Sequence, residues 1–307
     1  MNNFGAYQMY NPLTEMAHRL KTGKTDMSYE FNNLLNLMHL VPEQDWSGID
    51  KYFIISTGRT GTKFLARFIN GFDSTLSLHE PHPDFVNLGV DYASGKVSDE
   101  RAARKIERGR RVLCKRVKKQ GANRYVEPNN RLFSLIGVLD KVFDDIKIIH
   151  IVRDGRDYVR SGMSRIWYKE EDSDIRLKAS QFKDDEYRDR WSSMSRFEKI
   201  CWRWQKKDGF IYRSLEGKDN YIRVKFEDIF ARDNYTGLKR ICEYMNIPED
   251  EVRKNISSMM DNKINATKEY EIPDWRDWDD EMIDTFEEIA GEHMKRYYGY
   301  GWDSKSE

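Results

Sequence analysis

Apolar runs that alternate with amphipathic stretches fill the chain from residue 50 onward. Four continuous, β-favouring runs predict buried strands, at residues 51–57, 112–117, 146–152 and 221–226. A further short strand is expected at residues 74–78. Apolar positions three or four residues apart predict helices in between, over residues 63–70, 132–142 and 197–211. Strands that alternate with helices are typical of an α/β fold, so we expect three layers with a central parallel sheet.

The segments at the two ends have a different pattern. Residues 1–49 form a mostly polar arm, in which apolar residues between Phe31 and Leu40 predict a short helix. A last helix is expected from Trp278 to Tyr298, because acidic residues fill its first turn and basic residues fill its last.

One central stretch, residues 169–190, is dense in charges of both signs and poor in aliphatic residues. Such a composition contributes little core, so we expect a solvated insertion or a mobile lid here, with bounds near 165–195. The 307 residues then form one domain over 50–302, with the arm before it and a short tail at 303–307.

The charge balance and the cysteines restrict the class of protein further. Lys and Arg together number 52, as do Asp and Glu, so the net charge gives no reason to expect nucleic acid or a membrane surface as partner. The three cysteines stand far apart, without a metal-ligand spacing, and are expected to be free buried thiols: Cys114, Cys201 and Cys242. The first forty residues hold neither a signal-peptide core nor a spanning run, so we expect a soluble, cytoplasmic protein.

The segment over residues 56–64, with the sequence STGRTGTKF, joins the first strand to a helix. Backbone N–H groups and the helix dipole favour an anion at such a junction. A phosphate would meet two flexible glycines, two hydroxyl donors and one permanent positive charge, namely Gly58, Gly61, Thr60, Thr62 and Arg59. This pattern predicts a P-loop-like phosphate-binding loop, although an ordinary glycine-containing turn would have the same residues.

A nucleotide-triphosphate loop requires the pattern G-x-x-x-x-G-K-[ST]. Here Lys63 follows a shorter glycine spacing, and Phe64 occupies the position of the hydroxyl that would hold magnesium. The pattern therefore disfavours ATP with magnesium. A P-loop nucleotide kinase is kept as one alternative for the function of the protein.

A second candidate anion site follows the strand at 146–152. Arg153 ends this strand, Asp154 is placed to cap a helix, and Ser161 lies two turns further along the helix. The carboxyl ends of parallel strands meet at one edge of the sheet, so Arg153 and Ser161 are expected beside the first loop. Together the two strand ends predict a site for two phosphate groups.

These two motifs resemble those of the sulfotransferase family. Residues 57–65 are similar to its 5′-phosphosulfate loop, and residues 152–161 are similar to its 3′-phosphate motif. The resemblance continues through residues 223–229 and 278–302, and so covers most of the chain. It implies a donor, 3′-phosphoadenosine 5′-phosphosulfate (PAPS), a product, 3′,5′-adenosine bisphosphate (PAP), no metal, and a carbohydrate or other small-molecule hydroxyl acceptor.

The resemblance also implies roles for individual residues. The 5′ phosphosulfate would be held by Gly58, Arg59, Thr60, Gly61, Thr62, Lys63 and Phe64, and the 3′ phosphate by Arg153 and Ser161. Arginine at position 59 resembles the carbohydrate- and tyrosine-modifying members, whereas cytosolic small-molecule members have lysine there. Lys63 and Phe64 depart from the usual paired threonine and apolar residue.

Sulfuryl transfer needs positioning, cations and a base for the acceptor hydroxyl. Arg59 is the candidate for stabilising the leaving phosphate, and Lys63 is a candidate assistant. The segment Leu78-His-Glu-Pro81 supplies candidate bases, of which Glu80 is favoured over His79, and His82 is third. The alternative is that Glu80 only pairs within a loop and His79 is structural. A sulfotransferase-like protein that binds nucleotide without turnover is a further alternative.

Overall fold

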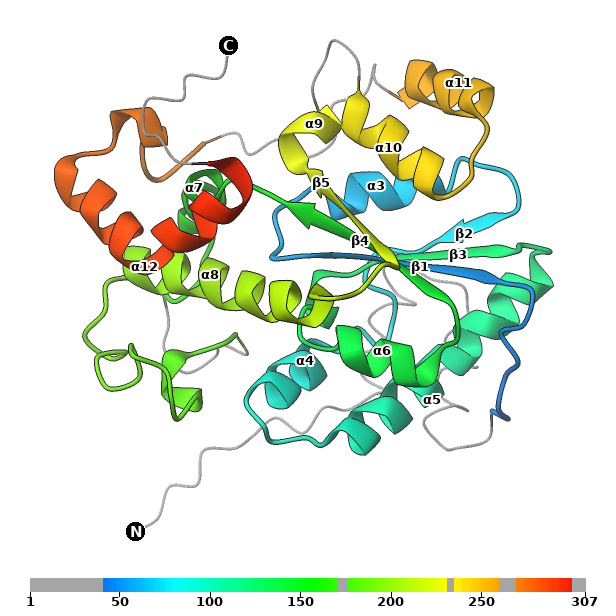
Figure 1. The fold of residues 1–307 in the computed structure, drawn as a ribbon, viewed down its shortest axis with the longest axis horizontal. Coiled ribbons are helices and arrows are strands. Elements are labelled where there is room, and N and C mark those ends of the chain that lie inside the picture. Colours follow the sequence, from blue (N-terminus) through cyan, green and yellow to red (C-terminus); the bar gives the residue numbers. More distant parts are fainter. Residues whose placement is uncertain (1–40, 170–175, 231–234, 260–268, 300–307) are drawn as a thin grey trace, which may run out of the picture.

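The computed structural model describes residues 41–169, 176–230, 235–259 and 269–299 (Figure 1). The helix expected between Phe31 and Leu40 and the tail at 303–307 lie outside the described residues. Within the described part, none of the helices is long and apolar enough to cross a membrane.

A parallel sheet of five strands forms the centre of the fold, in the order β2-β3-β1-β4-β5. Its strands are β1 (Asp50–Ser56), β2 (Thr75–Ser77), β3 (Arg124–Pro128), β4 (Ile146–Val152) and β5 (Tyr221–Lys225). In the middle strand, Ile54 is paired with Pro128 of β3 and with Ile149 of β4. The expected α/β class with a central parallel sheet is confirmed.

Helices cover both faces of the sheet (Figure 1). One face carries α3 (Thr62–Ile69), α9 (Phe226–Phe230), α10 (Thr236–Tyr244) and α11 (Glu249–Met259). The other carries α4 (Val86–Ala93), α5 (Asp99–Lys119), α6 (Ile136–Val142) and α8 (Arg196–Leu215). Two further helices pack against α8, namely α7 (Gly155–Met163) and α12 (Asp280–Tyr298). Short 3-10 turns are η1 (Asn130–Leu132), η2 (Ala179–Gln181) and η3 (Trp275–Asp277).

The sequence of β1 explains why it lies at the centre. Every residue from Lys51 to Ser56 is buried, because helices cover both sides of this strand. Tyr52 and Ile54 pack toward α3, whereas Phe53 and Ile55 pack toward α5 and α6. The side chains of this apolar run therefore pack into the hydrophobic cores on both faces of the sheet.

The strand predicted at residues 112–117 is wrong, because these residues form the last turns of α5. Ser98 caps this helix by accepting a hydrogen bond from the N–H of Arg101. Its buried positions recur at Ala102, Ile106, Leu113 and Val117, a helical spacing that a six-residue window does not reveal. The strand that occupies this place in the sheet is β3, whose short and partly charged sequence gives little strand signal.

The other expected elements agree with the structure, with small shifts of their ends. The helix expected over 132–142 is divided into η1 and α6. The last helix begins at Asp280, where the Asp279 carboxylate accepts a hydrogen bond from the N–H of Met282. All three cysteines are buried and free, as expected.

The part of residues 169–190 that the structure describes contributes three residues to the core. Leu177, Ala179 and Tyr187 are buried and join the core that also contains Trp191 and Trp202. The few apolar residues of this stretch are thus enough to anchor it against α8.

Candidate phosphate and catalytic site

The loop between β1 and α3 curls tightly. Gly58, Arg59 and Gly61 all have positive φ angles, of 107°, 59° and 67°. At Gly61 a side chain would meet a second obstacle, because an added Cβ would lie 2.7 Å from Cζ of Phe230. No side chain caps the start of α3. A curled backbone of this kind, at the start of a helix, is a favourable place for an anion.

Hydrogen bonds within the loop fix its shape. The hydroxyl of Ser56 accepts hydrogen bonds from the N–H of Gly58, at 3.2 Å, and from the hydroxyl of Thr60, at 2.7 Å. Thr60 is fully buried, so its hydroxyl supports the loop from inside. Lys63 is exposed on the first turn of α3, whereas the ring of Phe64 packs against Phe230.

Three residues of the two sequence motifs meet at the carboxyl edge of the sheet. The Nε atom of Arg59 donates a hydrogen bond to the hydroxyl of Ser161 at 2.8 Å, and Arg153 donates one to the backbone oxygen of Arg59. This meeting follows from the sheet order, because β1 and β4 are neighbours and Ser56 is paired with Ile151. Asp154 caps α7, as expected, by accepting a hydrogen bond from the N–H of Arg156.

Three arginines, Arg59, Arg153 and Arg165, lie near one another at this edge. Burial lowers the pKa of Arg59, and the nearby positive charges of Arg165 and Arg153 lower it further. The guanidinium of Arg153 lies 4.3 Å from the ring centre of Phe226, and its buried Nε has no hydrogen-bond partner among the described residues. Clustered cations and an unsatisfied buried donor both favour a bound anion.

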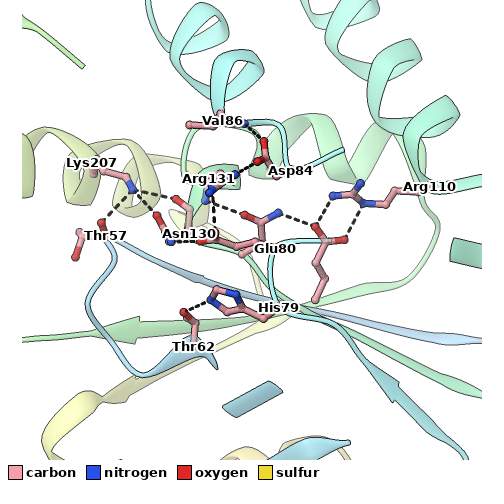
Figure 2. Close-up of polar contacts among 12 residues, drawn as sticks. Thr57, Thr62, His79, Glu80, Asp84, Val86, Arg110, Asn130, Arg131 and Lys207 are labelled. Carbon is pink, nitrogen blue, oxygen red and sulfur yellow. Dashed lines mark hydrogen bonds and ion pairs between the residues drawn. The ribbon is translucent and has the colours of Figure 1, made fainter. Parts of the chain in front are cut away.

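The segment after β2 holds the two candidate bases. The N–H of Leu78 donates to Val126 and that of Glu80 donates to Pro128, so this turn continues alongside β3. His79 joins it to the phosphate loop, because its Nε2 lies 3.0 Å from the hydroxyl of Thr62 (Figure 2). Burial lowers the pKa of His79, and the positive charges of Arg131 and Lys63 lower it further, although Glu80 opposes them.

Two residues of the turn after β3 hold the carboxylate of Glu80. One of its oxygens accepts a hydrogen bond from the amide of Asn130, and the other is 3.0 Å from Nε of Arg131 (Figure 2). Arg131 is paired with Asp84 as well. Glu80 is therefore an ion-paired residue beside the phosphate loop, in a fixed orientation. His82 lies two residues further along the same turn.

A comparison with models of protein families identifies one family for this chain. The family model described as the sulfotransferase family matches residues 52–251, which is more than half of the chain. The chain belongs to the sulfotransferase family.

Solved sulfotransferases have a similar fold. STF9 from Mycobacterium avium gives a TM-score of 0.53 at 12% identity, over 94% of this chain and 85% of that one. STF1 from Mycobacterium tuberculosis H37Rv gives 0.49 at 13% identity, over 84% and 80%. Mouse SULT7A1, solved in complex with PAP, gives 0.45 at 18% identity, over 80% and 85%. No curated protein sequence matches the chain.

This sulfotransferase-family protein has site residues that the motifs do not include. Lys207 of α8 reaches the phosphate loop, and Asn130 and Arg131 hold Glu80. The sequence contains one indication of the role of Lys207. This lysine lies on the same helix face as the apolar residues Trp204 and Ile211, both of which are buried. Asn130 and Arg131 follow a strand that gives almost no signal of its own. No group of three or more His, Cys, Asp or Glu side chains in the described ranges could hold a metal ion.

Proposed function

We propose that this protein transfers the sulfuryl group of PAPS to a hydroxyl group of a carbohydrate or another small molecule. The observation that carries the proposal is the meeting of Arg59, Arg153 and Ser161 at the ends of two neighbouring strands. A donor with a phosphosulfate at one end and a 3′ phosphate at the other needs two such anion sites side by side. Membership of the sulfotransferase family supports the same reaction.

The residues present fit both ends of PAPS. The backbone from Gly58 to Lys63, with the positive charge of Arg59, suits the 5′ phosphosulfate. The unsatisfied Nε of Arg153 and the buried hydroxyl of Ser161 suit the 3′ phosphate. Thr60 and Phe64 would contribute their backbone and packing, since the hydroxyl of Thr60 is bonded to Ser56 and the ring of Phe64 is in the core.

The proposed reaction is an in-line displacement at sulfur. The acceptor oxygen forms a bond to sulfur, the bond between sulfur and the 5′-phosphate oxygen breaks, and the acceptor proton passes to Glu80. Arg59 stabilises the negative charge that develops on the leaving phosphate, so that PAP is released as an anion. Glu80 is the proposed base because its carboxylate lies beside the phosphate loop in a fixed orientation, and His79 is the alternative.

A transfer assay with sulfur-labelled PAPS tests this function. The protein is incubated with labelled PAPS and a panel of oligosaccharides, phenols, lipids and peptides, and binding of PAP is compared with binding of ATP and magnesium by calorimetry. We expect tight PAP binding and label on one acceptor class, with oligosaccharides first. PAP binding without transfer to any acceptor would indicate a nucleotide-binding protein without turnover. Binding of ATP with magnesium in preference to PAP would indicate a kinase.

A further inference from the structure

A buried lysine lies beneath the phosphate loop. Lys207 comes from α8, is 3% exposed, and donates hydrogen bonds to the backbone oxygen of Thr57 at 3.0 Å and to that of Asn130 at 2.9 Å (Figure 2). A third bond, of 3.2 Å, reaches the side-chain oxygen of Asn130. One ammonium group therefore joins the first residue of the phosphate loop to the turn that follows β3.

Stability alone does not explain a lysine at this position. Its three direct partners are neutral oxygens, and only the charged ammonium form has three hydrogens to donate to them. Burial lowers the pKa of Lys207 well below its ordinary value, with Arg203 adding to the effect. A buried cation among neutral acceptors costs free energy that an apolar residue on the same helix face would not. The presence of the ammonium is better explained by the two segments that it joins, the phosphate loop and the turn that contains Asn130.

The contact with Asn130 determines which end of that amide faces Glu80. The amide oxygen is directed at Lys207, so the amide nitrogen is directed at Glu80, to which it donates a hydrogen bond. A reversed amide would set an oxygen against the carboxylate and a nitrogen against the ammonium, and both contacts would be repulsive. The charge on Lys207 thereby fixes a donor on the carboxylate that we propose as the base.

We propose that Lys207 is a positioning residue that joins the donor-binding loop to the base. Its contact with Thr57 holds the loop immediately before Gly58 and Arg59, and its contact with Asn130 orients the amide toward Glu80. Lys207, a single side chain of α8, then sets the distance between the donor-binding loop and Glu80. The inference rests on the proposed function, because it assigns Glu80 the role of base.

The test compares Lys207→Met with Asn130→Ala. In Lys207→Met we expect the Kd for PAP to rise about tenfold and kcat to fall about 100-fold, because the loop and the base both lose their support. The side-chain amide hydrogens of Asn130 should exchange with solvent about tenfold faster in Lys207→Met, because an amide that is no longer oriented loses its hydrogen bond to Glu80. This exchange is measured by ¹H–¹⁵N NMR, with Asn130→Ala to assign the signal. In Asn130→Ala the Kd for PAP should stay within about threefold of wild type.

Lys206→Met is the matched control. Lys206 lies on the same helix as Lys207, but its ammonium pairs with Asp185 at 2.7 Å, so PAP binding and the exchange of the Asn130 amide should be unchanged. Exchange of the Asn130 amide hydrogens that stays at its wild-type rate in Lys207→Met overturns the inference. If wild-type protein does not bind PAP, the proposed function fails, while the exchange of the Asn130 amide still decides whether Lys207 orients Asn130. Lys207→Gln, which also removes the charge, replaces Lys207→Met if that variant does not fold.

Discussion

Arg59 and Ser161 share a hydrogen bond of 2.8 Å although 102 residues separate them in the sequence. Arg59 belongs to the loop after β1, which leads to α3 on one face of the sheet, and Ser161 belongs to α7, which packs on α8 at the other. The chain thus leaves two neighbouring strands toward opposite faces. The carboxyl ends of two such neighbouring strands are the place where α/β sheets bind their ligands.

Arg153 allows the two ends of the proposed donor to be distinguished. Arg153→Ala should weaken binding of PAP by about 10- to 100-fold, because a charged hydrogen bond to phosphate is lost, and should weaken binding of 5′-AMP much less. The comparison with 5′-AMP corrects for the support that Arg153 gives to the backbone of Arg59. Isothermal titration calorimetry measures both affinities. Equal losses for the two nucleotides would contradict a 3′-phosphate role, and Arg253→Ala, an exposed residue of α11, is the control.

Arg59 is expected to act mainly on the transition state. Arg59→Ala should lower kcat by about 10²- to 10³-fold, the usual cost of removing one group that stabilises developing charge, and should raise the Kd for PAP by less. Arg59→Lys keeps the charge but loses the planar group that reaches Ser161, so its kcat should lie between those of wild type and Arg59→Ala. Steady-state kinetics with the acceptor from the transfer assay gives these values. A turnover rate unchanged in Arg59→Ala would remove this residue from the mechanism.

The two strand–loop–helix motifs could be predicted because their signals are local. The apolar run of β1, the glycines of its loop and the start of α3 are consecutive in the sequence, and the same holds for β4, Asp154 and α7. Neighbouring parallel strands then bring Arg59 and Arg153 together without further information. Prediction from the local sequence fails at residues 112–117. The apolar residues of this short segment favour a strand, but the spacing of the buried residues over the whole of α5 is helical.

The contact between Lys207 and Asn130, and the strand β3, could not be predicted from local signals. The charge of Glu127 obscures the strand pattern of β3. This charge is compatible with a buried strand because Arg110 of α5 pairs with it at 2.6 Å and 2.8 Å, and because Tyr125 and Asn129 donate further hydrogen bonds to it. The contact of Lys207 with Asn130 depends on how α8 packs against the sheet, 77 residues away in the sequence. Such contacts are consequences of the tertiary structure, so no pattern in either segment predicts them.

The choice between the candidate bases can be made from pH profiles. Glu80→Gln should lower kcat by about 10²- to 10⁴-fold, the usual contribution of a general base, because the amide cannot accept the proton. The acid limb of the kcat profile should disappear in Glu80→Gln and persist in His79→Gln. Burial lowers the pKa of His79 below its ordinary value near 6.5. The ring therefore stays neutral at pH values just below 6.5 and does not by itself produce an acid limb there. An acid limb that disappears in His79→Gln instead would make His79 the base.

His150 should make the fold sensitive to acid. It is completely buried in β4, its Nδ1 accepts a hydrogen bond of 3.3 Å from Arg223, and its Nε2 has no partner among the described residues. Burial lowers the pKa of His150 to about 4. An unfolded histidine has a pKa near 6.5, so between these values the unfolded chain binds a proton that the folded chain does not.

The free energy of unfolding must therefore fall as the pH drops from about 6.5 to about 4, by a total of about 3 kcal/mol from this one group. His150→Gln keeps an acceptor for Arg223 but cannot titrate, so it should lose about 2 kcal/mol less stability than wild type between pH 7 and pH 5. Urea unfolding at the two pH values measures both differences, and taking the difference within each protein removes the cost of the substitution itself at pH 7. Equal losses in the two proteins would mean that His150 titrates near its ordinary pKa, and that the core around β4 admits the proton without opening.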